Sequence, residues 1–217
     1  MILINSINKM SENKIEASFK IIIIGNSGVG KTSLLQRFLY NTFNETMFST
    51  LGINTTNKEI TLKNGKTILL KLFDTAGQER FRSLSRAFFR NVDGVLFVYA
   101  INDLKSFENI SDWIKIFLEN HNGKKDIPLY LVENKNDLER NVEKESIDEF
   151  LKQYNFRFKS VSAKLNEGNS INGLFLELSE ILGNNYKEPE AGQKRITIKD
   201  YKVKKMRKYD CRNCVQL

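Results

Sequence analysis

Short apolar runs alternate with amphipathic segments along most of the chain. Three runs are almost continuously apolar, at residues 19–24, 94–101 and 129–132. Such runs are typical of strands buried on both faces of a parallel sheet. Two further extended runs, at residues 59–62 and 68–73, flank Asn64-Gly65, a dipeptide that favours a tight hairpin turn. The pattern therefore predicts several central parallel strands and one antiparallel hairpin.

Amphipathic helices are predicted between these strands. Apolar residues recur at helical spacing in four groups: Leu34, Leu35, Phe38 and Leu39; Ile110, Trp113, Ile114 and Phe117; Ile147, Phe150 and Leu151; and Ile171, Leu174, Phe175, Leu178, Ile181 and Leu182. Ser106 is the expected N-cap before the second group, and Gly183 is the expected C-cap after the last. Strands that alternate with helices predict an α/β fold, with helices on both faces of a mainly parallel six-stranded sheet that has one antiparallel edge strand.

The first apolar run leads into a glycine-rich loop with the pattern G-x-x-x-x-G-K-[ST]. Glycines let the backbone aim successive N–H groups at one anion, at the start of the following helix. Lys31 adds a positive charge toward the β- and γ-phosphates, and Thr32 offers a hydroxyl to Mg²⁺. A glycine-rich turn can be purely structural, but this one follows a strand and opens a helix. The predicted phosphate-binding residues are Gly25, Ser27, Gly28, Val29, Gly30, Lys31, Thr32 and Ser33.

A second motif, N-K-x-D, follows the apolar run at 129–132 and indicates which base is bound. Guanine presents two donors on one edge, and the acceptor-only carboxylate of Asp137 takes both. Adenine lacks these donors, so the carboxylate would be left unpaired at a cost of about 1–3 kcal/mol. Asn134 is expected to bond the O6/N7 side, and the Lys135 stem to cover the ring. Three residues after the last predicted strand complete the base site, with the Ala163 N–H directed at O6: Ser162, Ala163 and Lys164.

A third group of residues suits hydrolysis of the terminal phosphate. Asp74 ends a predicted strand, where its carboxylate can hold a Mg²⁺-bound water. The Gly77 backbone can approach the γ-phosphate, and Gln78 can orient an attacking water. Thr50 can supply a hydroxyl to Mg²⁺ and a backbone N–H to the γ-phosphate. Loops held in this way around Thr50 and Gln78 would form a two-state switch that depends on one phosphate.

Together these motifs resemble the Ras superfamily of small GTPases and, within it, the Rab family. The Rab-like stretches are "FNETMFSTLGI", "DTAGQERFRSLSRAFFR" and "VYAI" before "SFENISDWI", and the resemblance covers about residues 19–183. It implies the P-loop NTPase fold of small G proteins, binding of GTP and GDP with Mg²⁺, and Phe43 packed on the guanine. It also implies a switch in vesicle-mediated membrane trafficking, with slow hydrolysis unless an activating protein assists.

Three departures from the family pattern fall in the region that effectors read. Phe73 stands where a Trp is usual, Asn54-Thr55 stand where an Asp-Phe pair is usual, and the hairpin near Lys63 is one residue longer. Two alternatives remain open at this point. One is a Ras-type signalling GTPase, and the other is a scaffold that binds GTP without hydrolysing it.

Composition and charge add a membrane-directed tail to this domain. The chain of 217 residues is consistent with one domain, has no apolar run long enough to span a bilayer, and begins without a secretory signal pattern. Its net charge is +8, and residues 184–217 contain ten Lys or Arg against four acids, so the excess lies mostly there. We predict a disordered arm at 1–18, a GTP-binding domain at 19–183 and a basic variable tail at 184–217.

The two cysteines, Cys211 and Cys214, both lie in the final "CRNCVQL". A metal half-site or idle thiols are possible readings, but the family resemblance favours C-a-a-X prenylation at Cys214 and a second lipid at Cys211. The basic tail would add attraction to anionic lipids, whereas nucleic-acid binding is not expected. The resemblance implies five partners: a nucleotide exchange factor, an activating protein, a GDP-dissociation inhibitor, a prenylation escort protein and effectors. The expected location is the cytosol and the cytoplasmic face of intracellular or plasma membranes.

Overall fold

The computed structural model describes residues 15–45, 52–75, 88–122 and 126–186. The described residues up to Asn185 belong to one compact unit. The elements of the compact unit are, in order, β1 (Ile15–Ile24), α1 (Lys31–Tyr40), β2 (Ile53–Thr61), β3 (Thr67–Thr75), β4 (Gly94–Ala100), α2 (Leu104–Glu108), α3 (Ile110–Asn120), β5 (Leu129–Asn134), α4 (Lys144–Gln153), β6 (Arg157–Ser160), the 3₁₀ turn η2 (Glu167–Asn169) and α5 (Ser170–Asn184).

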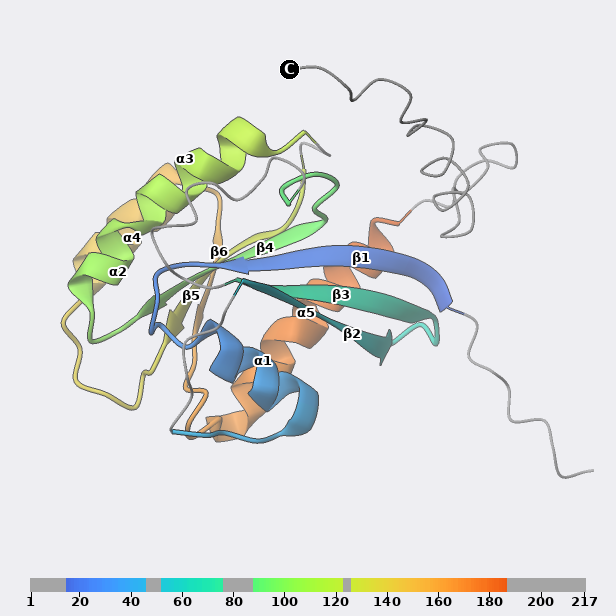
Figure 1. Cartoon of the computed structure of the whole chain (residues 1–217), viewed down its shortest axis with the longest axis horizontal. Coiled ribbons are helices and arrows are strands. Elements are labelled where there is room, and N and C mark those ends of the chain that lie inside the picture. Colours follow the sequence, from blue (N-terminus) through green and yellow to red (C-terminus); the bar gives the residue numbers. More distant parts are fainter. Residues whose placement is uncertain (1–14, 46–51, 76–87, 123–125, 187–217) are drawn as a thin grey trace, which may run out of the picture. The chain divides into compact units, whose positions relative to one another are not determined.

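The six strands form one sheet in the order β2-β3-β1-β4-β5-β6. All neighbours run parallel except β2, which pairs with β3 antiparallel at one edge. Figure 1 shows α1 and α5 on one face of the sheet and α2, α3 and α4 on the other. This is the α/β architecture that the alternation of strands and helices predicts. The parallel direction brings the ends of β1, β5 and β6 to the same edge of the sheet, where the candidate site lies.

Burial of the central strands explains their continuous apolar sequence. Ile21, Ile22, Ile23 and Ile24 are all fully buried, because helices cover both faces of β1. The predicted helical stripes also face the core, and the α3 stripe from Ile110 to Phe117 belongs to a cluster of buried hydrophobic residues. The predicted hairpin turn is confirmed as well. Gly65 has φ +83°, and its N–H donates to the Leu62 carbonyl at 2.9 Å.

The N-terminal arm predicted at residues 1–18 is wrong at its C-terminal end. β1 begins at Ile15, and its first residues pair with β3. In this part of the strand, Ala17 and Phe19 are buried while Ile15 and Ser18 are exposed. That alternation is typical of a strand with one face covered by other elements. It extends over only a few residues among polar neighbours, so the sequence alone did not predict a strand there. Residues 1–14 lie outside the described part of the chain.

Two predicted helix caps are also wrong. The N-cap of α2 is Asp103, whose Oδ1 accepts the Ser106 N–H at 3.1 Å, and Ser106 itself is buried inside the helix. Gly183 lies within α5, where the absence of a side chain lets the helix pack against Leu62. A Cβ on Gly183 would meet Leu62 Cδ1 at 2.2 Å. Gly183 therefore serves close packing, which a helix-end pattern cannot distinguish from a cap.

Candidate nucleotide-binding site

A cavity of about 390 Å³ opens at the carboxyl ends of β1, β5 and β6. This volume lies within the range of small-molecule sites in proteins. Most of the predicted phosphate and base residues that the structure describes line it together: Ser27, Gly28, Gly30, Lys31, Thr32, Ser33, Phe43, Asn134, Lys135, Asp137, Ala163 and Lys164. Three loops that are far apart in the sequence therefore form one concave surface.

The glycines of the first loop are required by two close backbone approaches. A Cβ on Gly25 would lie 2.1 Å from the Val98 carbonyl oxygen of β4, and φ is +149°. A Cβ on Gly30 would lie 2.3 Å from Asn134 Nδ2, and φ is +93°. Only glycine adopts these positive φ values without strain and leaves room for the neighbouring atoms. The loop is thus held against β4 and β5, with its N–H groups at the start of α1.

Lys31 is 5% exposed and spans the inside of this loop. Its ammonium donates to the Gly25 carbonyl at 3.0 Å and to the Asn26 carbonyl at 2.7 Å. Burial lowers the pKa of Lys31 to about 8, against the opposing effect of Asp74. A buried ammonium whose described hydrogen bonds go to neutral carbonyls favours an anionic ligand, which would stabilise the charged form.

Thr32 and Asp74 form an oxygen-rich corner beside Lys31. The Thr32 hydroxyl donates to Asp74 Oδ2 at 2.6 Å. Within the described residues, Asp74 Oδ1 is buried and has no hydrogen-bond partner. Burial raises the pKa of Asp74, although Thr32 and Lys31 both act to lower it. A buried carboxylate oxygen without a partner, next to a hydroxyl, fits a hard cation such as Mg²⁺ or one of its water ligands.

The base side of the cavity contains an oriented carboxylate. Asp137 Oδ1 accepts the Ser162 hydroxyl at 2.5 Å, and Ser162 Oγ accepts the Leu165 N–H at 3.0 Å. Lys135 adopts φ +62°, which allows the chain to turn sharply after β5. Ser162 therefore contributes by fixing Asp137, since it does not line the cavity itself.

Asn134 has partners inside the protein that the sequence did not predict. Its Nδ2 donates to the Val29 carbonyl at 2.8 Å, and its Oδ1 accepts the Ala163 N–H at 3.2 Å. The residue is 1% exposed. Asn134 thus joins the phosphate loop to the loop after β6. Asn134 and Ala163 also line the cavity, and their predicted bonds to the base stay a prediction.

Further contacts at the rim of the cavity were not evident from sequence motifs. Lys164 Nζ forms an ion pair with Glu45 Oε1 at 2.7 Å, which joins the segment after α1 to the loop after β6. Thr75 lines the cavity, and its hydroxyl donates to the Ile23 carbonyl at 2.9 Å. The position of Thr75 directly after Asp74 was the one available signal.

Several predicted residues do not line the cavity or lie outside the described part of the chain. Gly25, Val29, Ser162 and Asp74 lie next to the lining residues without lining the cavity. Thr50, Gly77 and Gln78 lie outside the described residues, as do Cys211 and Cys214. Within the described part of the chain, no helix combines the length and apolar character required to cross a membrane.

Comparison with known proteins identifies the family. The model of the Ras family matches residues 20–183. Ras-related protein Rab-13 of Bos taurus is 43% identical over 148 residues, which cover 67% of this chain and 71% of that protein. Ras-related protein SEC4 of Candida albicans is 38% identical over 175 residues, covering 80% and 81%. Ras-related protein Rab-10 of Diplobatis ommata is 40% identical over 173 residues, covering 79% and 84%.

The matched region runs from within β1 to near the end of α5 and includes all three loops of the cavity. The phosphate-loop pattern, the N-K-x-D segment and the relatives agree on one class of protein. The chain belongs to the Ras family and is a Rab-type small GTPase, a guanine-nucleotide-binding protein that hydrolyses GTP and acts as a switch in membrane trafficking.

Proposed function

We propose that the cavity holds GTP or GDP with its phosphates on the loop of residues 25–33 and its base against Asp137. The observation that carries this proposal is that Lys31 and Asp137 line one cavity from opposite loops. Lys31 supplies the positive charge for the β- and γ-phosphates, and the N–H groups at the start of α1 supply donors. Phe43 also lines the cavity, and we assign to it the role of covering one side of the base.

Asp137 is the residue to which we assign base selection. Its Oδ1 accepts the Ser162 hydroxyl, which orients the carboxylate and leaves its remaining acceptor sites for guanine. Guanine then pairs its N1–H and N2 amino group with the carboxylate. Asn134 sets the separation of the two loops through its bonds to Val29 and Ala163. Lys135 and Lys164 line the same end of the cavity.

Thr32, Asp74 and Thr50 are the residues to which we assign Mg²⁺. The support is the Thr32 hydroxyl together with the buried, unpartnered Asp74 Oδ1. When bound, Mg²⁺ neutralises charge on the β- and γ-phosphates. The protein positions the remaining groups: Gln78 would orient the attacking water, and the Gly77 N–H would donate to the γ-phosphate. Both assignments rest on the family pattern, because these residues lie outside the described part of the chain.

The partners follow from family membership and are likewise proposals. We assign effectors and an activating protein to the segments around Thr50 and Gln78, and an exchange factor to the release of GDP. The tail would be prenylated at Cys214, with Cys211 as a second site, through an escort protein, and a GDP-dissociation inhibitor would extract the protein. The basic tail then supports cycling between the cytosol and the cytoplasmic face of membranes.

Competition between purine nucleotides tests the proposed site. The full-length protein is stripped of nucleotide, loaded with fluorescent methylanthraniloyl-GDP, and challenged with unlabelled GDP, GTP or ADP. GDP and GTP should compete, and ADP should bind about 10⁴-fold more weakly, since a site built to pair donors rejects a base that lacks them. Asp137→Ala should reduce this preference. Glu139→Ala removes an exposed carboxylate from the same loop and should not. Equal competition by ADP would refute the assignment of Asp137.

A further inference from the structure

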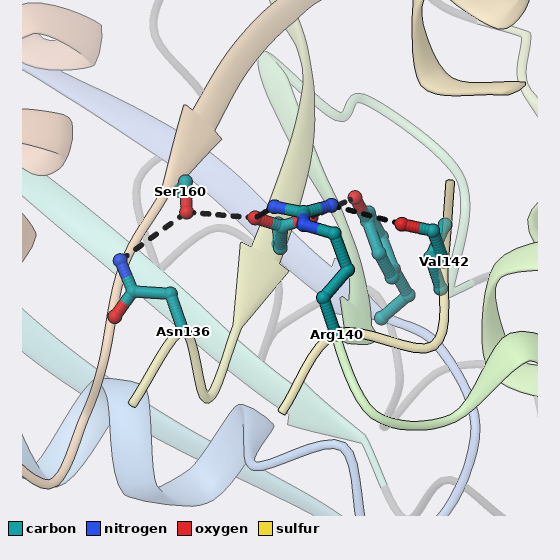
Figure 2. Close-up of polar contacts among 6 residues, drawn as sticks. Asn136, Arg140, Val142 and Ser160 are labelled. Atoms are coloured by element: carbon teal, nitrogen blue, oxygen red, sulfur yellow. Dashed lines mark hydrogen bonds and ion pairs between the residues drawn. The ribbon is translucent and has the colours of Figure 1, made fainter. Parts of the chain in front are cut away.

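A fully buried carboxylate lies directly before the base-recognition segment. Glu133 is 0% exposed, at the end of β5, one residue before Asn134. Its Oε1 accepts from Arg140 Nη2 at 2.8 Å and from Ser160 Oγ at 2.8 Å. Its Oε2 accepts from Tyr99 Oη at 2.7 Å and from Arg140 Nη1 at 2.9 Å. The carboxylate therefore has four donors, which come from β4, β6 and the loop after β5 (Figure 2).

These partners make the Glu133 carboxylate a fixed point. Burial and the neighbouring Glu133 raise the pKa of Tyr99, so its hydroxyl remains a donor. Arg140 binds with two parallel N–H groups, a geometry that restrains orientation as well as distance. Removing one partner of such a buried pair is costly, because the other charge is then uncompensated.

Arg140 links the two ends of the base-recognition segment. It follows residues 134–139 in the chain, and its side chain contacts Glu133, which directly precedes them. Its Nη1 also donates to the Val142 carbonyl at 3.0 Å. Arg140 therefore connects the two ends of the segment that carries Lys135 and Asp137.

A second set of bonds holds the middle of this segment to β6. Asn136 Nδ2 donates to Ser160 Oγ at 3.2 Å, and Ser160 donates in turn to Glu133. The Asn136 N–H donates to the Val161 carbonyl at 3.2 Å. Figure 2 shows Asn136, Ser160, Arg140 and Val142 arranged along one chain of contacts. The bonds run from the edge of the sheet to both sides of Asp137.

We propose that Arg140 is a positioning residue for guanine recognition, which acts by clamping Glu133 so that the segment 134–139 presents Asp137 at a fixed place. This inference rests on the proposed function, in which Asp137 accepts the guanine N1–H and N2 amino group. It assigns to Arg140 a role in nucleotide selectivity without contact with the nucleotide, since Arg140 does not line the cavity. With Arg140 in place, the Asp137 carboxylate is positioned to accept from both the N1–H and the N2 amino group of guanine. Without it, we expect only one of these two bonds to form well.

Inosine diphosphate separates this role from a purely stabilising one. Its base keeps N1–H and O6 but lacks the N2 amino group, so the GDP-to-IDP ratio reports the second bond to Asp137. Dissociation rates of the methylanthraniloyl derivatives of GDP and IDP are measured on full-length protein with Mg²⁺ and excess unlabelled GDP. Arg140→Lys keeps the charge but loses the two-pronged geometry. Arg140→Lys also leaves the buried Glu133 carboxylate less well paired. The double variant Glu133→Gln with Arg140→Met, which removes both charges, is therefore measured beside it.

The matched control is Tyr99→Phe, which removes one donor from the same buried carboxylate but leaves Arg140 in place. Wild-type protein should release IDP faster than GDP, and both Arg140 variants should reduce that ratio about tenfold, as expected for loss of one hydrogen bond to a charged group. Tyr99→Phe should lower the melting temperature and leave the ratio unchanged.

The outcomes distinguish the two levels of the proposal. An unchanged ratio in folded Arg140 variants, with a lower melting temperature alone, would show that Arg140 only stabilises the fold. Failure of both variants to fold would overturn the proposal for the same reason. If wild-type protein releases IDP and GDP at about the same rate, Asp137 does not recognise the N2 amino group. That result would contradict the proposed function itself, whatever the variants do.

Discussion

The indole N–H of Trp113 donates to Asn26 Oδ1 at 3.0 Å, which connects α3 to the phosphate loop. Asn26 also accepts the Lys31 ammonium on its backbone carbonyl, at 2.7 Å. Trp113 is 6% exposed and belongs to the same cluster of buried hydrophobic residues as the rest of the α3 stripe. A helix far along the sequence therefore fixes the loop residue that orients Lys31.

Loss of this contact should loosen the bound phosphates. We expect Trp113→Phe and Asn26→Ala each to speed release of fluorescent GDP about fivefold, since a hydrogen bond contributes about 1 kcal/mol. The double variant should be no faster than the quicker single variant, because both remove the same bond. The measurement is the dissociation rate under excess unlabelled GDP. Multiplicative effects in the double variant would show that the two residues act independently.

The Thr32–Asp74 corner predicts how the protein responds to loss of Mg²⁺. Chelation with EDTA should speed GDP release from the wild-type protein, because the phosphates lose their counter-charge. Thr32→Ala should release GDP fast already and respond weakly to EDTA. Ser27→Ala, on the same loop, serves as the control and should retain the full EDTA response. A Thr32→Ala protein that is as sensitive to EDTA as wild type would contradict the metal assignment.

Gln78 is predicted to orient the attacking water. Gln78→Leu should nearly abolish GTP hydrolysis while GTP affinity is unchanged, because leucine offers neither donor nor acceptor. Single-turnover phosphate release from preloaded protein measures the first, and competition with labelled GDP the second. Hydrolysis at the wild-type rate would remove Gln78 from the mechanism. Weakened GTP binding would instead mean that Gln78 contributes to the ground state.

The cysteine-bearing end predicts how the protein reaches membranes. Cys211→Ser combined with Cys214→Ser should leave the full-length protein in the soluble fraction of cells, since a prenyl chain and a basic segment are both needed for stable anchoring. Fractionation of cell lysates measures this, with each single variant beside the double one. Persistent membrane association of the double variant would place the anchor elsewhere.

Two glycines that both lack room for a Cβ should respond differently to substitution. Gly25→Ala should destabilise the protein by about 2–4 kcal/mol, because the new Cβ meets the Val98 backbone and φ is positive. Gly183→Ala should change stability by less than about 1 kcal/mol, because the atom it meets is the end of the Leu62 side chain and alanine favours a helix. Urea unfolding of GDP-loaded protein compares the two. Equal losses would contradict this distinction between backbone and side-chain contacts.

The sequence was sufficient for elements whose signals are local. The apolar run of β1, the Asn64-Gly65 turn and the α3 stripe each report burial or backbone geometry within a few residues, and all three predictions are confirmed. The phosphate-loop pattern could also be recognised from the sequence, because its glycines and Lys31 lie within eight positions of the chain. The two loops of the base site were predicted from motifs, and the cavity brings them together.

Local signals failed where a distant element decides the role of a residue. Gly183 matches the pattern of a helix end, yet it lies inside α5 and packs against Leu62. The N-K-x-D motif likewise gave no sign that the Asn134 amide joins Val29 to Ala163. In both cases the competing partner lies more than 25 positions away, so no spacing rule within the motif could reveal it.

The sequence by itself determined the class of fold and the family of small GTPases, and it predicted the residues that we assign to phosphate and guanine, because backbone freedom, hydrophobic periodicity and donor patterns are properties of short segments. Only the tertiary structure decided that Glu133 is a buried carboxylate with four donors, that Arg140 closes the base-recognition loop, and that Trp113 holds Asn26. Those contacts arise when the parallel strands place their ends side by side, and their strength depends on burial, which is a property of the packed molecule and not of any one segment.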